Sequence, residues 1–91
     1  MPRVENQVSV INKLGLHARA AIKLVQLVAN FKAKITLCNG EKQGSADSVV
    51  GLLMREAAQG QTIRVICEGP EAFEVMEAVQ HLFEARFDEN E

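Results

Sequence analysis

The chain has 91 residues, a formal net charge of −2 and a pI near 5.7. Hydrophobic residues make up 47% of it and charged residues 24%, which is typical of one folded domain with a packed core. The absence of any basic run excludes an electrostatic footprint for nucleic acid or anionic lipid, and we expect neither as a partner.

No stretch approaches the roughly 18 consecutive apolar residues that span a bilayer, and MPRVENQVSV lacks the apolar core of a signal peptide. We therefore expect a cytoplasmic protein. Cys38 and Cys67 lie in separate apolar segments, without a CxxC pattern or a histidine at metal-ligand spacing. These cysteines are predicted to be buried, reduced thiols, and we expect no metal and no cofactor.

Polar and apolar side chains in strand-like patterns predict strands at residues 7–12, 33–38 and 61–68. The Asn-Gly pair at residues 39 and 40 predicts a tight turn, so a short strand around residues 41–45 should fold back on the second strand as a hairpin.

Apolar residues at helical spacing predict three helices. The first runs over residues 18–31. A short second helix, capped by Ser45 or Asp47, passes through VVGLLM, and the last covers residues 71–86. The closing FDENE is expected to fray.

The resulting order is β-α-β-β-α-β-α, and strands joined by a hairpin argue against an all-parallel sheet. The predicted fold is α+β: an open-faced β-sandwich in which three helices cover one face of a four-stranded antiparallel sheet. The sequence contains no internal repeat and no linker rich in Pro, Gly or Ser, so residues 1–91 are predicted to form a single domain.

His17 comes immediately before the first predicted helix. Its ring would stand beside the unsatisfied N–H groups and the positive dipole end of that helix, where an anion is stabilised. A phosphoryl group on the imidazole would share its charge with those groups and with Arg19, and Gly15 permits a tight backbone approach. A histidine beside a helix start is also commonly a cap or a surface residue, so spacing alone leaves both interpretations open.

The segment NKLGLHARAA at residues 12–21 resembles the active-site signature G-L-H-A-R-P-A of the histidine-containing phosphocarrier (HPr) family of the bacterial phosphoenolpyruvate phosphotransferase system. The turn at Gly60 and the segments ADSVVGLLM and EGPE also fall at that family's spacings. The resemblance implies that phosphorylated enzyme I donates to Nδ1 of His17, that Arg19 assists, and that the group passes to an EIIA-type domain. Such a chain is a phosphoryl-transfer intermediate and not an autonomous catalyst.

The resemblance also implies a docking surface around the histidine. The matching positions lie beside the site in sequence or on the short helix, and comprise Gly15, Leu16, Ala18, Ala20, Val49, Val50 and Leu53. For Val49 and Leu53, a role in the core is the alternative. Ala20 replaces the usual proline, so the helix start loses a fixed φ and regains a backbone N–H.

Ser48 falls where many members of the family carry a serine that a dedicated HPr kinase/phosphorylase modifies. A phosphate there would oppose acidic partners, whereas a plain cap or first-turn serine is the alternative. A second function is therefore open, that of a regulatory docking module of the same fold controlled at Ser48. His81 lacks such context and is expected at the surface.

The family resemblance implies a monomer. It leaves open whether the carrier serves sugar transport or the nitrogen-regulatory branch of the system. The LLM run and the acidic FDENE tail are features shared with nitrogen-branch members.

Overall fold

The computed structural model describes residues 2–40, 42–45 and 58–88. Its elements are β1 (Arg3–Ser9), α1 (Ala18–Val28), β2 (Lys34–Asn39), β3 (Lys42–Ser45), β4 (Thr62–Glu68), α3 (Ala72–Glu84) and a 3-10 turn, η1 (Arg86–Asp88). That part of the chain therefore contains two α-helices instead of the three expected. The helix expected through VVGLLM falls outside the described residues.

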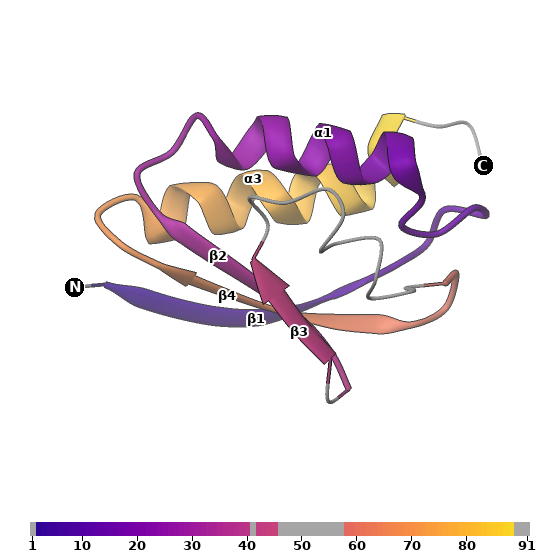
Figure 1. Cartoon of the computed structure of the whole chain (residues 1–91), viewed down its shortest axis with the longest axis horizontal. Helices are drawn as coiled ribbons and strands as arrows, with labels where there is room; N and C mark the ends of the chain where they lie inside the picture. The colour runs from indigo at the N-terminus through magenta and orange to yellow at the C-terminus, as the bar shows by residue number, and fades with distance from the viewer. Residues whose placement is uncertain (1, 41, 46–57, 89–91) are drawn as a thin grey trace.

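The four strands form one antiparallel sheet in the order β1-β4-β2-β3. The inner strand β4 pairs with β1, where Ile63 lies opposite Val8, and with β2, where Val65 lies opposite Leu37. Helices α1 and α3 lie side by side over one face of this sheet (Figure 1). The prediction of an α+β fold with a four-stranded antiparallel sheet is confirmed.

The core lies between the sheet and the two helices. Alternation along β4 turns Ile63, Val65 and Cys67 toward the helices, and each is at most 1% exposed. The helix residues buried against them are Ala20, Ala21, Leu24 and Val28 of α1, and Ala72, Val75, Met76, Val79 and Phe83 of α3. Removal of this apolar surface from water is the main force that holds the layers together.

Both cysteines are free and buried, as the sequence predicts. Burial raises the pKa of the Cys67 thiol to about 11, so this side chain stays protonated at neutral pH. Because the thiolate is the reactive form of cysteine, Cys67 is a packing residue and not a nucleophile.

The first strand is displaced from its predicted position at residues 7–12. It begins at Arg3 and ends at Ser9, because antiparallel pairing with β4 orders polar residues that show little alternation in sequence. Val8 and Val10 produce the strand-like alternation in the sequence, but Val10 already belongs to the loop that leads to α1, where it and Asn12 are fully buried.

The expectation that FDENE frays is wrong for its first two residues. Phe87 is 1% exposed, and its ring packs edge-on against Phe83 with the ring centroids 4.8 Å apart. Lys23 of α1 donates a hydrogen bond of 2.7 Å to the Phe87 carbonyl, and its Nζ lies 3.5 Å from Asp88 Oδ2. These contacts hold Arg86, Phe87 and Asp88 in left-handed conformations, with φ between 54° and 64°.

The turn that follows α1 and the turn that precedes α3 are joined by hydrogen bonds. Lys32 N donates to Glu71 Oε1 at 2.7 Å, while Glu71 N donates to the Lys32 carbonyl at 3.1 Å. Gly69, with φ +130°, donates to the Pro2 carbonyl at 2.9 Å. A Cβ atom on Gly69 would lie 2.9 Å from the Lys32 carbonyl oxygen and 3.0 Å from Ala33 Cα, so only glycine fits this close approach.

Replacing Gly69→Ala should lower the free energy of unfolding by about 2–4 kcal/mol, because the new methyl group meets backbone that cannot move aside. Gly40→Ala is the matched control, since Gly40 also has a positive φ, +65°, but nothing lies within 4 Å of its added Cβ. This control should lose only about 1 kcal/mol, the cost of the left-handed backbone. Equal losses in urea unfolding of the two variants would contradict the close-contact argument.

Candidate functional site

His17 is the N-cap residue of α1, at the point where the loop after β1 becomes helix. Its backbone is extended, with φ −86° and ψ 179°, and its carbonyl accepts a hydrogen bond of 2.9 Å from Ala21 N. The side chain is half-buried and makes no capping hydrogen bond. By helix geometry, the N–H groups of Ala18, Arg19 and Ala20 point out of the helix start without an acceptor inside the helix.

The carbonyl oxygen of Gly15 organises the loop that leads to His17. It accepts Asn12 Nδ2 at 2.7 Å and His17 N at 3.0 Å, while Gly15 N donates to the Asn12 carbonyl at 3.2 Å. Gly15 has φ +68°, a left-handed conformation that glycine adopts without strain. The path of the backbone into His17 is thus set by three hydrogen bonds between neighbouring residues.

The start of this loop is fastened to the turn that precedes β4. Val10 N donates to the Gln61 carbonyl at 2.9 Å, and Gly60 N donates to the Val10 carbonyl at 2.8 Å. Gln59 Nε2 adds a hydrogen bond of 3.2 Å to the Ile11 carbonyl. The loop is therefore held by the sheet on one side and by α1 on the other, which limits the movement of the histidine between them.

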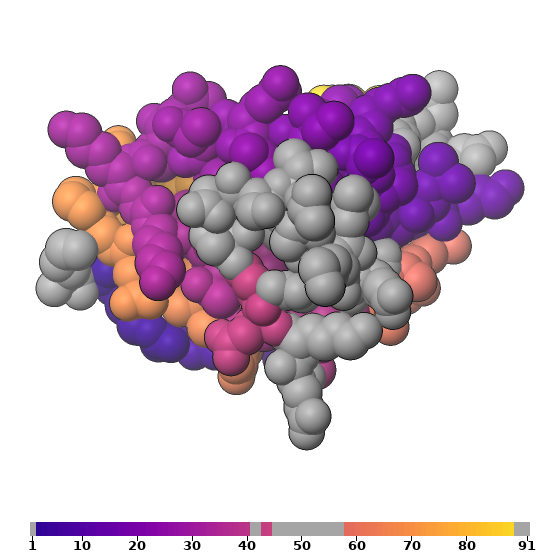
Figure 2. Space-filling model, in the orientation of Figure 1, coloured from indigo at the N-terminus to yellow at the C-terminus, as the bar shows by residue number. Residues whose placement is uncertain are grey.

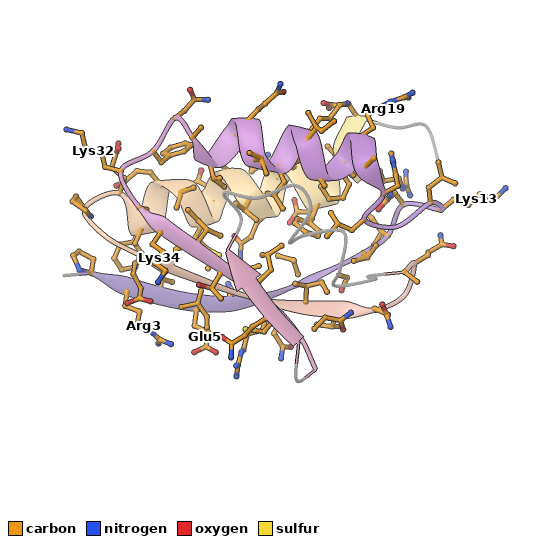
Figure 3. The ribbon with its side chains drawn as sticks, viewed as in Figure 1. Arg3, Glu5, Lys13, Arg19, Lys32 and Lys34 are labelled. Atoms are coloured by element: carbon orange, nitrogen blue, oxygen red, sulfur yellow. The ribbon has the colours of Figure 1, made fainter. Side chains whose placement is uncertain are left out.

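The charges around the start of α1 favour an anion. No acidic residue lies in the first turn, so nothing there opposes the positive end of the helix dipole. Arg19 is exposed, and within the described part of the chain its guanidinium takes part in no ion pair. Figure 3 shows Arg19 over the start of α1 and Lys13 at the tip of the preceding loop, both extending outward. In sequence, these two cationic residues lie on either side of His17.

The apolar surface beside His17 differs from the one expected. Leu16 and Ala20 are 5% and 1% exposed and belong to the core, so they offer a partner little surface, and their docking role stays a prediction. Both are buried because the removal of apolar side chains from water stabilises the fold. The exposed apolar side chains of the loop are Leu14, at 69%, and Ile11, at 38%. The loop and the start of α1 form one end of the molecular surface (Figure 2).

The other predicted site residues divide into two groups. Gly15 is buried and Ala18 is exposed, and both adjoin His17 in the backbone path described above. The remaining four lie outside the described residues: Ser48, Val49, Val50 and Leu53.

Asn12 is the residue of this site that sequence reasoning overlooked. Its side chain is 0% exposed and lies among otherwise apolar core residues. The signal was present, since an asparagine three residues before a glycine at a strand end is typical of loops in which the amide bonds nearby backbone.

The described residues contain no group of three or more His, Cys, Asp and Glu side chains that could hold a metal ion. None of the helices in those residues is long and apolar enough to cross a membrane. His81 is exposed on α3, and its prediction as a surface residue is confirmed.

Known proteins resemble this chain over nearly its whole length. Residues 4–85 match the family model described as the PTS HPr component phosphorylation site. The chain is 49% identical over 89 residues to the phosphocarrier protein NPr of Shewanella violacea, which covers 98% of both proteins. It is 41% identical over 87 residues to the phosphocarrier protein HPr of Xylella fastidiosa, covering 96% of this chain and 98% of that protein.

The fold shows the same likeness. The crystal structure of HPr-C-His from Thermoanaerobacter tengcongensis superposes with a TM-score of 0.91 and 31% identity, over 97% of this chain and 99% of that one. The matched residues 4–85 include both the sheet and the loop that carries His17. The chain therefore belongs to the HPr family, the phosphocarriers of the phosphotransferase system.

Proposed function

We propose that this phosphocarrier accepts a phosphoryl group from phosphorylated enzyme I on Nδ1 of His17 and passes it to an EIIA-type domain. The observation that carries the assignment is the half-exposed imidazole at the N-cap of α1, which caps the helix through its backbone only. A phosphoryl group on that ring would lie near the N–H groups of the first helical turn, and the exposed guanidinium of Arg19, two residues along the chain, is expected to share its charge.

Each transfer exchanges one bond to phosphorus for another. The imidazole lone pair forms the N–P bond as the bond between the donor and phosphorus breaks. The electron pair of the broken bond stays with the donor. Delivery is the same exchange, with the acceptor's nucleophile replacing the imidazole nitrogen. The N–H groups and Arg19 act on the phosphoryl oxygens by sharing their negative charge. The carrier needs no cofactor for either step.

Ala20 adds a donor that proline would lack. As the third residue of α1, it carries one of the N–H groups without an acceptor inside the helix. Proline at this position would fix φ but remove that group. We propose that the alanine compensates for looser backbone geometry by offering the phosphoryl group one more hydrogen bond.

We further propose an apolar docking surface beside the histidine. Leu14 is 69% exposed in the site loop, which supports contact with a partner protein. The third helix of the fold, expected through VVGLLM, would contribute Val49, Val50 and Leu53. Regulation at Ser48 by an HPr kinase/phosphorylase, and with it the alternative of a regulatory docking module, stays a prediction.

The cellular setting is part of the proposal. Residues 1–91 would form one monomeric domain that acts in the cytoplasm, where enzyme I and EIIA-type proteins are expected to meet it. Identity of 49% to an NPr, against 41% to an HPr, supports the nitrogen-regulatory branch of the system.

Replacing His17→Ala should abolish phosphorylation. With enzyme I and labelled phosphoenolpyruvate, the unaltered chain should gain an acid-labile, alkali-stable phosphate, and the variant should gain none because alanine has no nucleophilic nitrogen. His81→Ala is the matched control, on the exposed side of α3, and should be labelled fully. Label retained after His17→Ala would disprove the site assignment.

Replacing Arg19→Gln should slow transfer to and from the carrier by roughly 10- to 100-fold, because one donor to the phosphoryl oxygens is lost. The fold should persist, since Arg19 is exposed. Arg3→Gln serves as the control, because Arg3 lies at the opposite end of the molecule (Figure 3). Rapid-quench measurement of both half-reactions tests this, and unchanged rates for Arg19→Gln would refute the charge-sharing role.

A further inference from the structure

We propose that Asn12 is a positioning residue for phosphoryl transfer, which acts on His17 through the carbonyl of Gly15. The inference rests on the function proposed above. Asn12 is 0% exposed, so it cannot touch a partner protein. Whatever it contributes to transfer must therefore pass through the residues that it contacts inside the carrier.

A buried amide is a costly way to fill a core. An amide group taken out of water costs free energy unless hydrogen bonds replace those to water, and an apolar side chain of similar size would avoid that cost. What the amide provides and an apolar side chain cannot is direction, because Asn12 Nδ2 holds the Gly15 carbonyl oxygen at 2.7 Å. The asparagine thus specifies where that carbonyl points.

Without the hydrogen bond from Asn12, the Gly15 carbonyl could change its direction. Gly15 is in a left-handed conformation, φ +68°, and glycine exchanges easily between conformations that other residues avoid. Rotation of the peptide group after Gly15 would carry its oxygen away from His17 N, which now donates to it at 3.0 Å. The hydrogen bond from Asn12 opposes that rotation, so the same oxygen orders both ends of the loop.

The hydrogen bond from Asn12 to the Gly15 carbonyl matters because phosphoryl transfer depends on where His17 lies. Its imidazole must bring the phosphoryl oxygens to within hydrogen-bond distance of the N–H groups at the start of α1. Displacement of reacting groups by about 1 Å can cost on the order of 100-fold in rate. A loop that samples several Gly15 conformations would therefore hold the phosphoryl group well only part of the time, even with the fold intact.

The substitution that tests this is Asn12→Asp, which keeps the size of the side chain and replaces the donor by an oxygen. An ionised carboxylate cannot donate to the Gly15 carbonyl and repels it. We expect kcat for transfer from phosphorylated enzyme I to fall about 10- to 100-fold. KM for enzyme I should change less than about twofold, because the residue is fully buried and cannot touch a partner protein.

Asn30→Asp is the matched control. Asn30 is exposed beyond the far end of α1, so the same chemical change there should leave kcat and KM unaltered. A kcat for Asn12→Asp equal to that of the control would overturn the positioning role. An increase in KM with unchanged kcat would also overturn it, because the residue would then act on docking.

The pH dependence of kcat distinguishes a positioning role from a merely structural one. Acidification protonates the introduced carboxyl group, whose O–H can again donate to the Gly15 carbonyl, and burial raises the pKa of such a group. Relative to the unaltered chain, kcat of Asn12→Asp should therefore recover between about pH 8 and pH 6. Circular dichroism at each pH would show whether the fraction of folded protein is constant. A constant kcat ratio across this range would reject the proposal.

A second measurement covers a variant that fails to fold. In the unaltered chain, nuclear magnetic resonance should show the Asn12 side-chain amide protected from exchange and shifted when His17 is phosphorylated. An amide signal indifferent to phosphorylation would overturn the inference. If the unaltered chain took no phosphate from enzyme I, both the proposed function and the positioning role would be rejected. Normal labelling of the unaltered chain with no effect of Asn12→Asp would reject the positioning role alone.

Discussion

The carbonyl oxygen of Gly15 is the point on which the site depends. It receives one hydrogen bond from a buried side chain, Asn12, and one from the backbone of His17, and so links the core to the start of α1. A single acceptor can serve both because glycine permits the left-handed turn between them. The position of the imidazole is thus a property of the folded core and not of a flexible surface loop.

The rest of the molecule keeps α1 in place above the sheet. Its apolar face packs on the strands, and Lys23 fastens it to the C-terminal turn through the Phe87 carbonyl. Beyond the C-terminal end of α1, the main chain of Lys32 bonds the carboxylate and the backbone N–H of Glu71, which holds the turn after α1 against the entry to α3. The helix is therefore anchored at its middle and beyond its C-terminal end, and these contacts, away from the histidine, fix the direction in which its positive end points.

Much of this arrangement is predictable from the sequence, and the exceptions share a physical cause. Periodicity predicted β2, β4 and both described helices, the Asn-Gly turn predicted β3, and local context placed His17 before a helix start. It failed for β1, where pairing with β4 and not alternation decides the boundary, and for Phe87, where a contact with distant Phe83 orders a polar tail. Long-range pairing and packing leave no trace in a short window of sequence.

The same limit applies at the site. Leu16 and Ala20 lie within the signature and were expected to contribute to a docking surface, but their burial in the core is decided by tertiary packing. Asn12 was overlooked because one asparagine in sequence is a turn residue by default. Its importance follows from complete burial, which only the folded chain reveals.

The exposure of the site suits a carrier that must release what it binds. An ion pair deep in a core would hold a phosphoryl group by interactions that a partner protein could neither reach nor replace. Here the imidazole is half-buried, Arg19 is exposed, and the helix N–H groups supply charge stabilisation that costs no reorganisation. If the site stabilised the phosphorylated histidine much more than the free one, delivery to the acceptor would be slow. Moderate stabilisation keeps both the transfer from enzyme I and the transfer to the acceptor feasible. A rigid backbone that presents moderately stabilising groups therefore suits reversible transfer better than a tighter pocket would.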